Sequence, residues 1–187
     1  MTVLVHRMNI NKHKIEYAMK TNHIIEELKR NKTVFKDILE NLSHEQYNWR
    51  FNPEKWCLLE IVCHLYDEER EDFRERVKHI LANPELPLNS IDPVGWVKSR
   101  NYIERDYNSA LEDFLNERDN SVKWLEQFEN PQWDNFYKHL KLGNLSAKMI
   151  FANWLAHDYL HIRQILKLKY EYSKNSSGED LSYAGEW

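Results

Sequence analysis

The residues best suited to chemistry are two histidines four positions apart, His157 and His161, in the stretch HDYLHIRQI. Both belong to an apolar series with spacings of three and four residues, which is typical of the buried face of a helix. Side chains at positions i and i+4 lie one turn apart, with Cβ atoms about 6 Å from each other. Two imidazole nitrogens could therefore converge on one metal ion, provided that a third ligand comes from another segment.

His64 is the best candidate for that third ligand. It lies in LLEIVCHLYDEEREDF on the same helical side as Ile61 and Leu65, which predicts an inward-facing ring. Three neutral imidazoles inside a helical bundle would suit Zn²⁺, Ni²⁺ or Fe²⁺ and leave coordination positions open for water. The other six histidines are weaker candidates, since they fall in a polar N-terminal segment, near helix ends or in a connection: His6, His13, His23, His44, His79 and His139.

A simpler interpretation keeps the same histidines as hydrogen-bonded core residues, which is the usual role of a histidine on an apolar stripe. The spacing alone supports both interpretations. Asp158 follows the first histidine of the pair, so the glutamate of an HExxH zinc protease is absent. Asp67 and Glu68 could orient a ligand ring or accept a proton, but the run YDEERED is more simply a solvated acidic helix face.

Four segments with a helical period would have to position these side chains. Only 4 Gly and 5 Pro occur in 187 residues, a composition typical of long helices joined by few turns. Ser43 with Gln46 has capping-box spacing, while Asn108 and Ser146 are expected N-caps. The helices are expected at about 14–41, 58–81, 109–128 and 146–172.

The sequence therefore predicts an all-α fold, a four-helix bundle in a single domain spanning 1–187. The stretch ANPELPLNSIDPVGW is too long for a tight turn, so we expect a long crossover that could let helices two and three run in the same direction. Residues 1–13 are expected to form an N-terminal arm. The tail 173–187 ends in aromatic residues and is expected to dock back on the bundle.

Charge and composition exclude several functional classes. The 26 Lys+Arg and 30 Asp+Glu are mixed along the chain and give a net charge of -4, so no surface for nucleic acid is indicated. No apolar run approaches the roughly 20 residues of a membrane span, and the N-terminus lacks a signal-peptide core. Cys57 and Cys63 fit neither a CxxC pair nor a secreted disulfide framework. We expect a cytoplasmic protein with no nucleic-acid or membrane partner.

Several motifs, taken in order, resemble the DinB-like superfamily and specifically its branch that ends in YAGEW. They are KWCLLEIVCHLYDEEREDF, IDPVGW, DYNSALEDFLNERD, HDYLHIRQI and the terminal YAGEW itself, and the resemblance covers about residues 15–187. It implies a four-helix bundle with up-up-down-down connectivity and a divalent metal ion held by His64, His157 and His161. It also implies a homodimer and, in some relatives, a low-molecular-weight thiol such as bacillithiol, mycothiol or glutathione as cosubstrate.

The expected function is accordingly that of a metal-dependent enzyme acting on a small-molecule substrate, either a thiol-dependent S-transferase or a hydrolase. Two alternatives stay open at this point. One is a non-catalytic metal-binding or partner-binding bundle, and the other is a bundle whose core histidines hold no metal. Trp96, Tyr183 and Trp187 are the aromatic residues considered as pocket walls.

Overall fold

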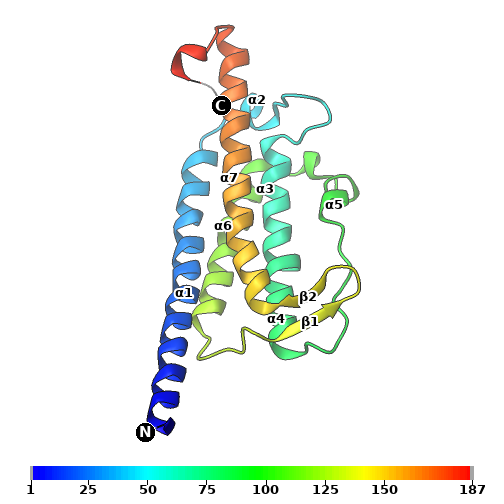
Figure 1. Cartoon of the computed structure of the whole chain (residues 1–187). Coiled ribbons are helices and arrows are strands. Elements are labelled where there is room, and N and C mark those ends of the chain that lie inside the picture. Colours follow the sequence, from blue (N-terminus) through cyan, green and yellow to red (C-terminus); the bar gives the residue numbers. More distant parts are fainter. Residues whose placement is uncertain (1, 186–187) are drawn as a thin grey trace.

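Four long helical segments make up the fold (Figure 1). The computed structural model describes residues 2–185, with side chains from residue 21 onward. The expected all-α bundle is confirmed, with one small β-hairpin added. The long segments are α1 (Thr2–Leu39), α3 (Leu58–Asp67) continued through a π-helical turn (Glu68–Phe73) into α4 (Arg74–Ala82), α6 (Tyr107–Glu126) and α7 (Ala147–Ser177).

Shorter elements fill the connections. They are α2 (His44–Asn48), α5 (Pro93–Ser99), two 3₁₀ turns (Tyr102–Glu104 and Ser182–Ala184), and an antiparallel hairpin of β1 (Phe136–His139) and β2 (Gly143–Ser146). The hairpin was not expected, because FYKHLKLGN lacks a clear alternation of apolar and polar residues. None of the described helices is long and apolar enough to cross a bilayer.

The long crossover leads from α4 to α6 and makes these two helices run in the same direction, as the loop length suggested. In Figure 1, α1 ascends, α3–α4 and α6 descend, and α7 ascends. The Tyr107 hydroxyl at the start of α6 donates a 2.7 Å hydrogen bond to the carbonyl of Leu39 at the end of α1. The up-up-down-down connectivity implied by the resemblance is therefore wrong. The helix directions are up-down-down-up, because residues 83–106 run back alongside α3 before α6 begins.

Two of the three predicted N-caps match the structure, and one does not. Ser43 and Gln46 form the expected capping box, and the Ser146 hydroxyl accepts from the N–H of Met149 at the start of α7. Helix α6 begins after Asp106, not at Asn108, because the Asp106 carboxylate caps it. Helix α1 already begins at Thr2, so residues 2–13 of the expected arm are helical.

Tyr183 and Trp187 are the two aromatic residues of the C-terminal tail that the sequence suggested as pocket walls. The Tyr183 side chain is fully exposed, so it forms no wall of an internal site. Trp187 lies outside the described residues. Docking of the tail on the bundle therefore stays a prediction.

The apolar core is divided into two clusters along the bundle axis. One contains Phe35 and Phe114, whose rings meet edge to face with centroids 5.2 Å apart, and the other contains Trp133 and Phe151, stacked at 4.8 Å. Between the clusters, every long segment contributes buried polar side chains. We call these the polar layer: Asn31, Asp67, Glu68, Glu69, Arg118, Asp158 and His161.

Arg118 is the hub of the polar layer, with a side chain only 1% exposed. Its guanidinium donates two hydrogen bonds of 2.8 Å to the Glu69 carboxylate on the π-helical turn and two of 2.7 Å to the Asp158 carboxylate on α7. Asn31 donates to Asp158 at 3.1 Å, and the Trp154 indole N–H donates to Glu69 at 2.9 Å. The network thereby fixes the π-helical turn against α7.

Replacing Arg118 by Met should lower the free energy of unfolding by about 3–5 kcal/mol, because Glu69 and Asp158 would be left as buried, uncompensated carboxylates. Urea denaturation followed by circular dichroism measures the loss. Arg105→Met is the matched control, since Arg105 makes an exposed pair with Asp113 at 3.4 Å that should contribute under about 1 kcal/mol. Equal losses in the two variants would contradict the inference that the Arg118 network fixes the π-helical turn against α7.

Candidate metal centre

Three histidine rings meet where α3 faces α7. The ring centroids lie 5.6 Å apart for His64 and His157, 5.0 Å for His64 and His161, and 4.3 Å for His157 and His161. One nitrogen of each ring lies within 4.8 Å of a nitrogen of the other two. The structure thus brings together the three histidines that the sequence singled out.

Helix geometry explains how each ring reaches this point. His64 is in the last turn of α3, where the flanking Cys63 and Leu65 are buried in the core. His157 and His161 are one turn apart on α7, so their rings meet edge to face on the same side of the helix. Helix α7 is rotated to this face because Asp158, the residue after His157, is fixed by the polar layer.

The surroundings of the three rings are largely apolar and aromatic. His64 and His161 are 5% and 7% exposed, and His157 is half-buried. Trp56 contacts the His64 ring at 4.8 Å between centroids, and Phe73 contacts the His157 ring at 4.9 Å. Trp96, which the sequence suggested as a pocket wall, is buried beneath the Arg100 guanidinium. The site is flanked by Trp56 and Phe73, which the sequence did not single out as walls.

Burial keeps the three imidazoles neutral. It lowers the pKa of His64 to about 3, of His157 to about 2 and of His161 to about 4. The neighbouring imidazoles lower the pKa values of His64 and His157 further, since two adjacent positive charges would repel each other. At neutral pH each ring therefore has a nitrogen lone pair to offer.

The donor atoms fit a divalent ion. The Nδ1 atom of His64 is buried and has no hydrogen-bond partner among the described residues, and such orphaned nitrogens are rare in protein interiors. The Nε2 atoms of His157 and His161 lie 3.0 Å apart, a separation compatible with two ligands of one ion. Three neutral imidazole nitrogens are a donor set for Zn²⁺, Ni²⁺ or Fe²⁺.

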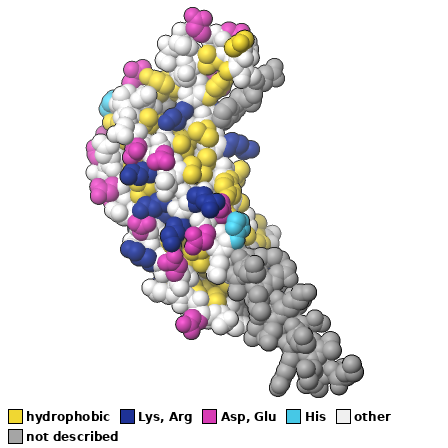
Figure 2. All heavy atoms as spheres, turned by 90° about the vertical axis from the view of Figure 1, so that its left-hand side faces the viewer, with side chains coloured by type: hydrophobic (Ala, Val, Ile, Leu, Met, Phe, Trp, Pro, Cys, Tyr) yellow, Lys and Arg dark blue, Asp and Glu magenta, His cyan; other side chains and the backbone are white. Residues whose placement is uncertain are grey.

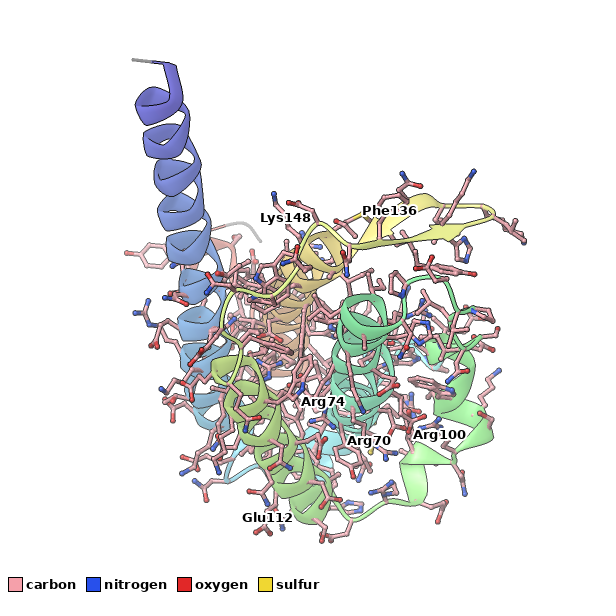
Figure 3. All side chains as sticks on the ribbon, turned by 90° about the horizontal axis from the view of Figure 1, so that it is seen from below. Arg70, Arg74, Arg100, Glu112, Phe136 and Lys148 are labelled. Atoms are coloured by element: carbon pink, nitrogen blue, oxygen red, sulfur yellow. The ribbon has the colours of Figure 1, made fainter. Side chains whose placement is uncertain are left out.

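The acidic run after His64 is not the solvated face that the sequence suggested. Asp67, Glu68 and Glu69 are 2–4% exposed, because they lie where α3 passes into the π-helical turn and belong to the polar layer. Asp67 accepts from the Tyr102 hydroxyl at 2.6 Å and pairs with Arg100 at 2.7 Å. In Figure 3, Arg70 and Arg100 are labelled side by side between α5 and the helix that carries His64. The negative charge of Asp67 is thus balanced by Arg100, and Tyr102 donates a hydrogen bond to it.

Glu68 differs from its two acidic neighbours. Burial and the nearby Asp72 raise its pKa to about 8, so this carboxyl group keeps a proton at neutral pH. It lies one turn after His64 along the helix. Glu68 is therefore a buried carboxyl group whose proton is shared in a hydrogen bond with Asp72, whereas the sequence suggested a ligand-orienting or proton-accepting role.

Two residues that position the site were missed from the sequence, Arg118 and Asp158. A signal for Arg118 was present, because it continues the apolar stripe of Phe114 and Val122 at four-residue spacing. A charged residue on such a stripe has to find buried partners. Which partners it finds depends on the neighbouring helices, and no spacing within one helix contains that information.

In metal-free protein, the rings of His64, His157 and His161 should stay neutral from about pH 8 down to about pH 5, because their pKa values lie near 3, 2 and 4. An unfolded chain takes up these protons near pH 6.5, so the three groups should lower stability as pH falls below that value. Proton–nitrogen correlation spectra of the imidazoles follow each ring directly, with a histidine-containing peptide as control. Protonation of any of the three rings above about pH 5 would contradict the geometry described.

Comparison with known proteins places these features in a family. The sequence model of the DinB superfamily matches residues 27–165, a range that includes all three histidines. No curated protein matches the chain. Among solved structures, the fold is similar to YfiT from Bacillus subtilis, described as a probable metal-dependent hydrolase with an unusual four-helix bundle topology. The TM-score is 0.71 at 16% sequence identity, covering 86% of this chain and 89% of that one. The chain belongs to the DinB superfamily.

Proposed function

We propose that this protein is a metal-dependent enzyme that carries out hydrolysis or group transfer on a small molecule, with a divalent ion held by His64, His157 and His161. The observation that carries the proposal is the meeting of three buried, neutral imidazoles with donor atoms within 4.8 Å of one another. A bound ion of this kind lowers the pKa of a coordinated water or thiol and stabilises a developing oxyanion.

The number of protein ligands favours a catalytic role over a structural one. Structural zinc sites have four protein ligands, whereas catalytic sites have three and leave a position for water or substrate. Within the described residues the cluster contains three histidines and no carboxylate or thiol. A purely structural or regulatory metal site is therefore the less favoured alternative.

The residues around the three histidines exclude water, supply a proton and fix the positions of the helices. Trp56 and Phe73 flank the imidazoles with apolar surface, which strengthens electrostatic interactions by excluding water. Glu68, one turn after His64, holds a proton at its carboxyl group at neutral pH and can donate it to a leaving group. The Arg118 network keeps the π-helical turn and α7 at a fixed separation.

Hydrolysis is supported by the description of YfiT, and thiol-dependent S-transfer is the second candidate. For the second candidate the structure adds one constraint. Burial raises the pKa of the Cys63 thiol to about 12 and also raises that of Cys57, so neither is a thiolate at neutral pH. A thiol nucleophile would have to come from a low-molecular-weight cosubstrate.

Protein prepared without a histidine tag should bind one divalent ion per chain. His64→Ala, His157→Ala and His161→Ala should each reduce the bound metal severalfold or more, because each removes one of three ligands. Elemental analysis after dialysis measures the stoichiometry. His23→Ala on the exposed surface of α1 is the matched control and should keep full occupancy. Metal content near zero in the parent protein, unchanged in the three variants, would remove the metal-dependent function.

A panel of esters, amides and reactive electrophiles, tested with and without cytosolic thiols, separates the two candidate activities. Turnover that needs no thiol supports a hydrolase, and turnover that needs one supports an S-transferase. In both cases His64→Ala should abolish turnover together with metal binding. Full metal loading without turnover of any panel member would favour the non-catalytic alternative.

A further inference from the structure

A shallow groove of about 580 Å³ lies on the exposed side of α7, next to the histidine site. Its lining residues are Leu160, His161, Arg163, Gln164 and Lys167. His161 is the one proposed metal ligand among them. All five residues belong to α7, and through His161 the groove borders the histidine site.

The charge of the groove is positive and uncompensated. Arg163 and Lys167 contribute two cations, and no carboxylate lines the groove. In the described part of the chain neither side chain forms an ion pair. Every other arginine with a described side chain pairs with a carboxylate. Figure 2 shows dark blue and magenta side chains interspersed over the face that contains α1, where Lys29 pairs with Glu126 and Lys32 with Asp119.

The spacing of the two cations makes their presence harder to explain by stability. Arg163 and Lys167 are at positions i and i+4 of α7, where like charges repel and destabilise a helix by a few tenths of a kcal/mol. The chain as a whole carries a net charge of -4. Two unpaired cations one turn apart are thus slightly unfavourable for the helix, but together they present positive charge that an anion could neutralise.

We propose that the groove binds the anionic group of the substrate, a carboxylate or a phosphate, while the reacting end of that molecule lies at the histidine site. The guanidinium of Arg163 offers two parallel N–H donors, a geometry that suits both anions. Lys167 is six residues beyond His161, about 9 Å along the helix axis. Leu160, 54% exposed, offers apolar contact for the carbon chain between the two ends.

This inference rests on the proposed function only for the position of the reacting end. Anion binding by Arg163 and Lys167 needs no metal. It can therefore be tested on the metal-free protein, where an added carboxylate or phosphate has no ion to coordinate.

The test uses three probes of equal chain length, hexanoate, hexyl phosphate and 1-hexanol, titrated into the metal-free protein and followed by backbone amide NMR. At least one anion should bind saturably, with shifts centred on residues 160–167, and the dissociation constant should rise with salt concentration. Whether hexanoate, hexyl phosphate or both bind then identifies the anion. Binding of 1-hexanol as tight as that of the anions would overturn the proposal, because apolar contact alone would then explain it.

The double variant Arg163→Gln/Lys167→Gln should raise the dissociation constant of the anion about tenfold, since it removes the charge-assisted hydrogen bonds. Lys123→Gln/Lys141→Gln removes the same charge from exposed positions on α6 and the hairpin and should leave the constant unchanged. Equal effects in the two double variants would show a general charge effect and contradict the groove. Both pairs are exposed, and the salt dependence of the parent protein is an independent check should a variant fold poorly.

The two proposals can fail separately. Arg163→Gln/Lys167→Gln should still bind one zinc ion per chain, because it leaves His64, His157 and His161 in place. Zinc binding without anion binding would reject the groove and keep the metal centre. Anion binding in a protein that takes up no zinc would keep the groove and reject the metal-dependent reaction.

Discussion

The charged network around Arg118 is the constraint on which the rest of the structure depends. One guanidinium is shared between Glu69 on the π-helical turn and Asp158 on α7, with all three side chains out of contact with water. Buried ion pairs add little stability over an apolar core, but they make alternative helix positions costly, because a shift would leave a charge unpaired. A slide or rotation of α7 would separate Asp158 from Arg118. The network therefore selects one register for the helix that carries His157 and His161.

The polar layer also explains why imidazoles occupy positions where leucines would pack. It interrupts the apolar core between two clusters, and the histidines lie at its edge, beside Trp56 and Phe73. There the rings are buried enough to stay neutral, yet His161 still borders a groove open to solvent. Neutral donors, an apolar wall and an access route are what a metal-assisted reaction on a small molecule requires.

The sequence predicts the histidine site better than the structure around it. His64, His157 and His161 could be selected because each continues an apolar helical stripe, a local property that spacing reveals. The direction of α6 depends on the path of residues 83–106. The burial of Asp67, Glu68 and Glu69 depends on α5 packing against α3, and on α6 and α7 packing against the π-helical turn. Such tertiary contacts produce no periodic pattern of residues in the sequence. For the same reason the pairing of Arg118 with Asp158 was not predicted.

The proposed metal centre requires that three imidazoles from α3 and α7 bind the same ion. X-ray absorption spectroscopy of the zinc-loaded protein can decide this, since the method measures the ligand atoms and their distances. We expect three nitrogen neighbours at about 2.0–2.1 Å, with the remaining ligands being oxygen. A sulfur neighbour at about 2.3 Å, which would implicate Cys57 or Cys63, or a shell of oxygen atoms alone, would contradict it.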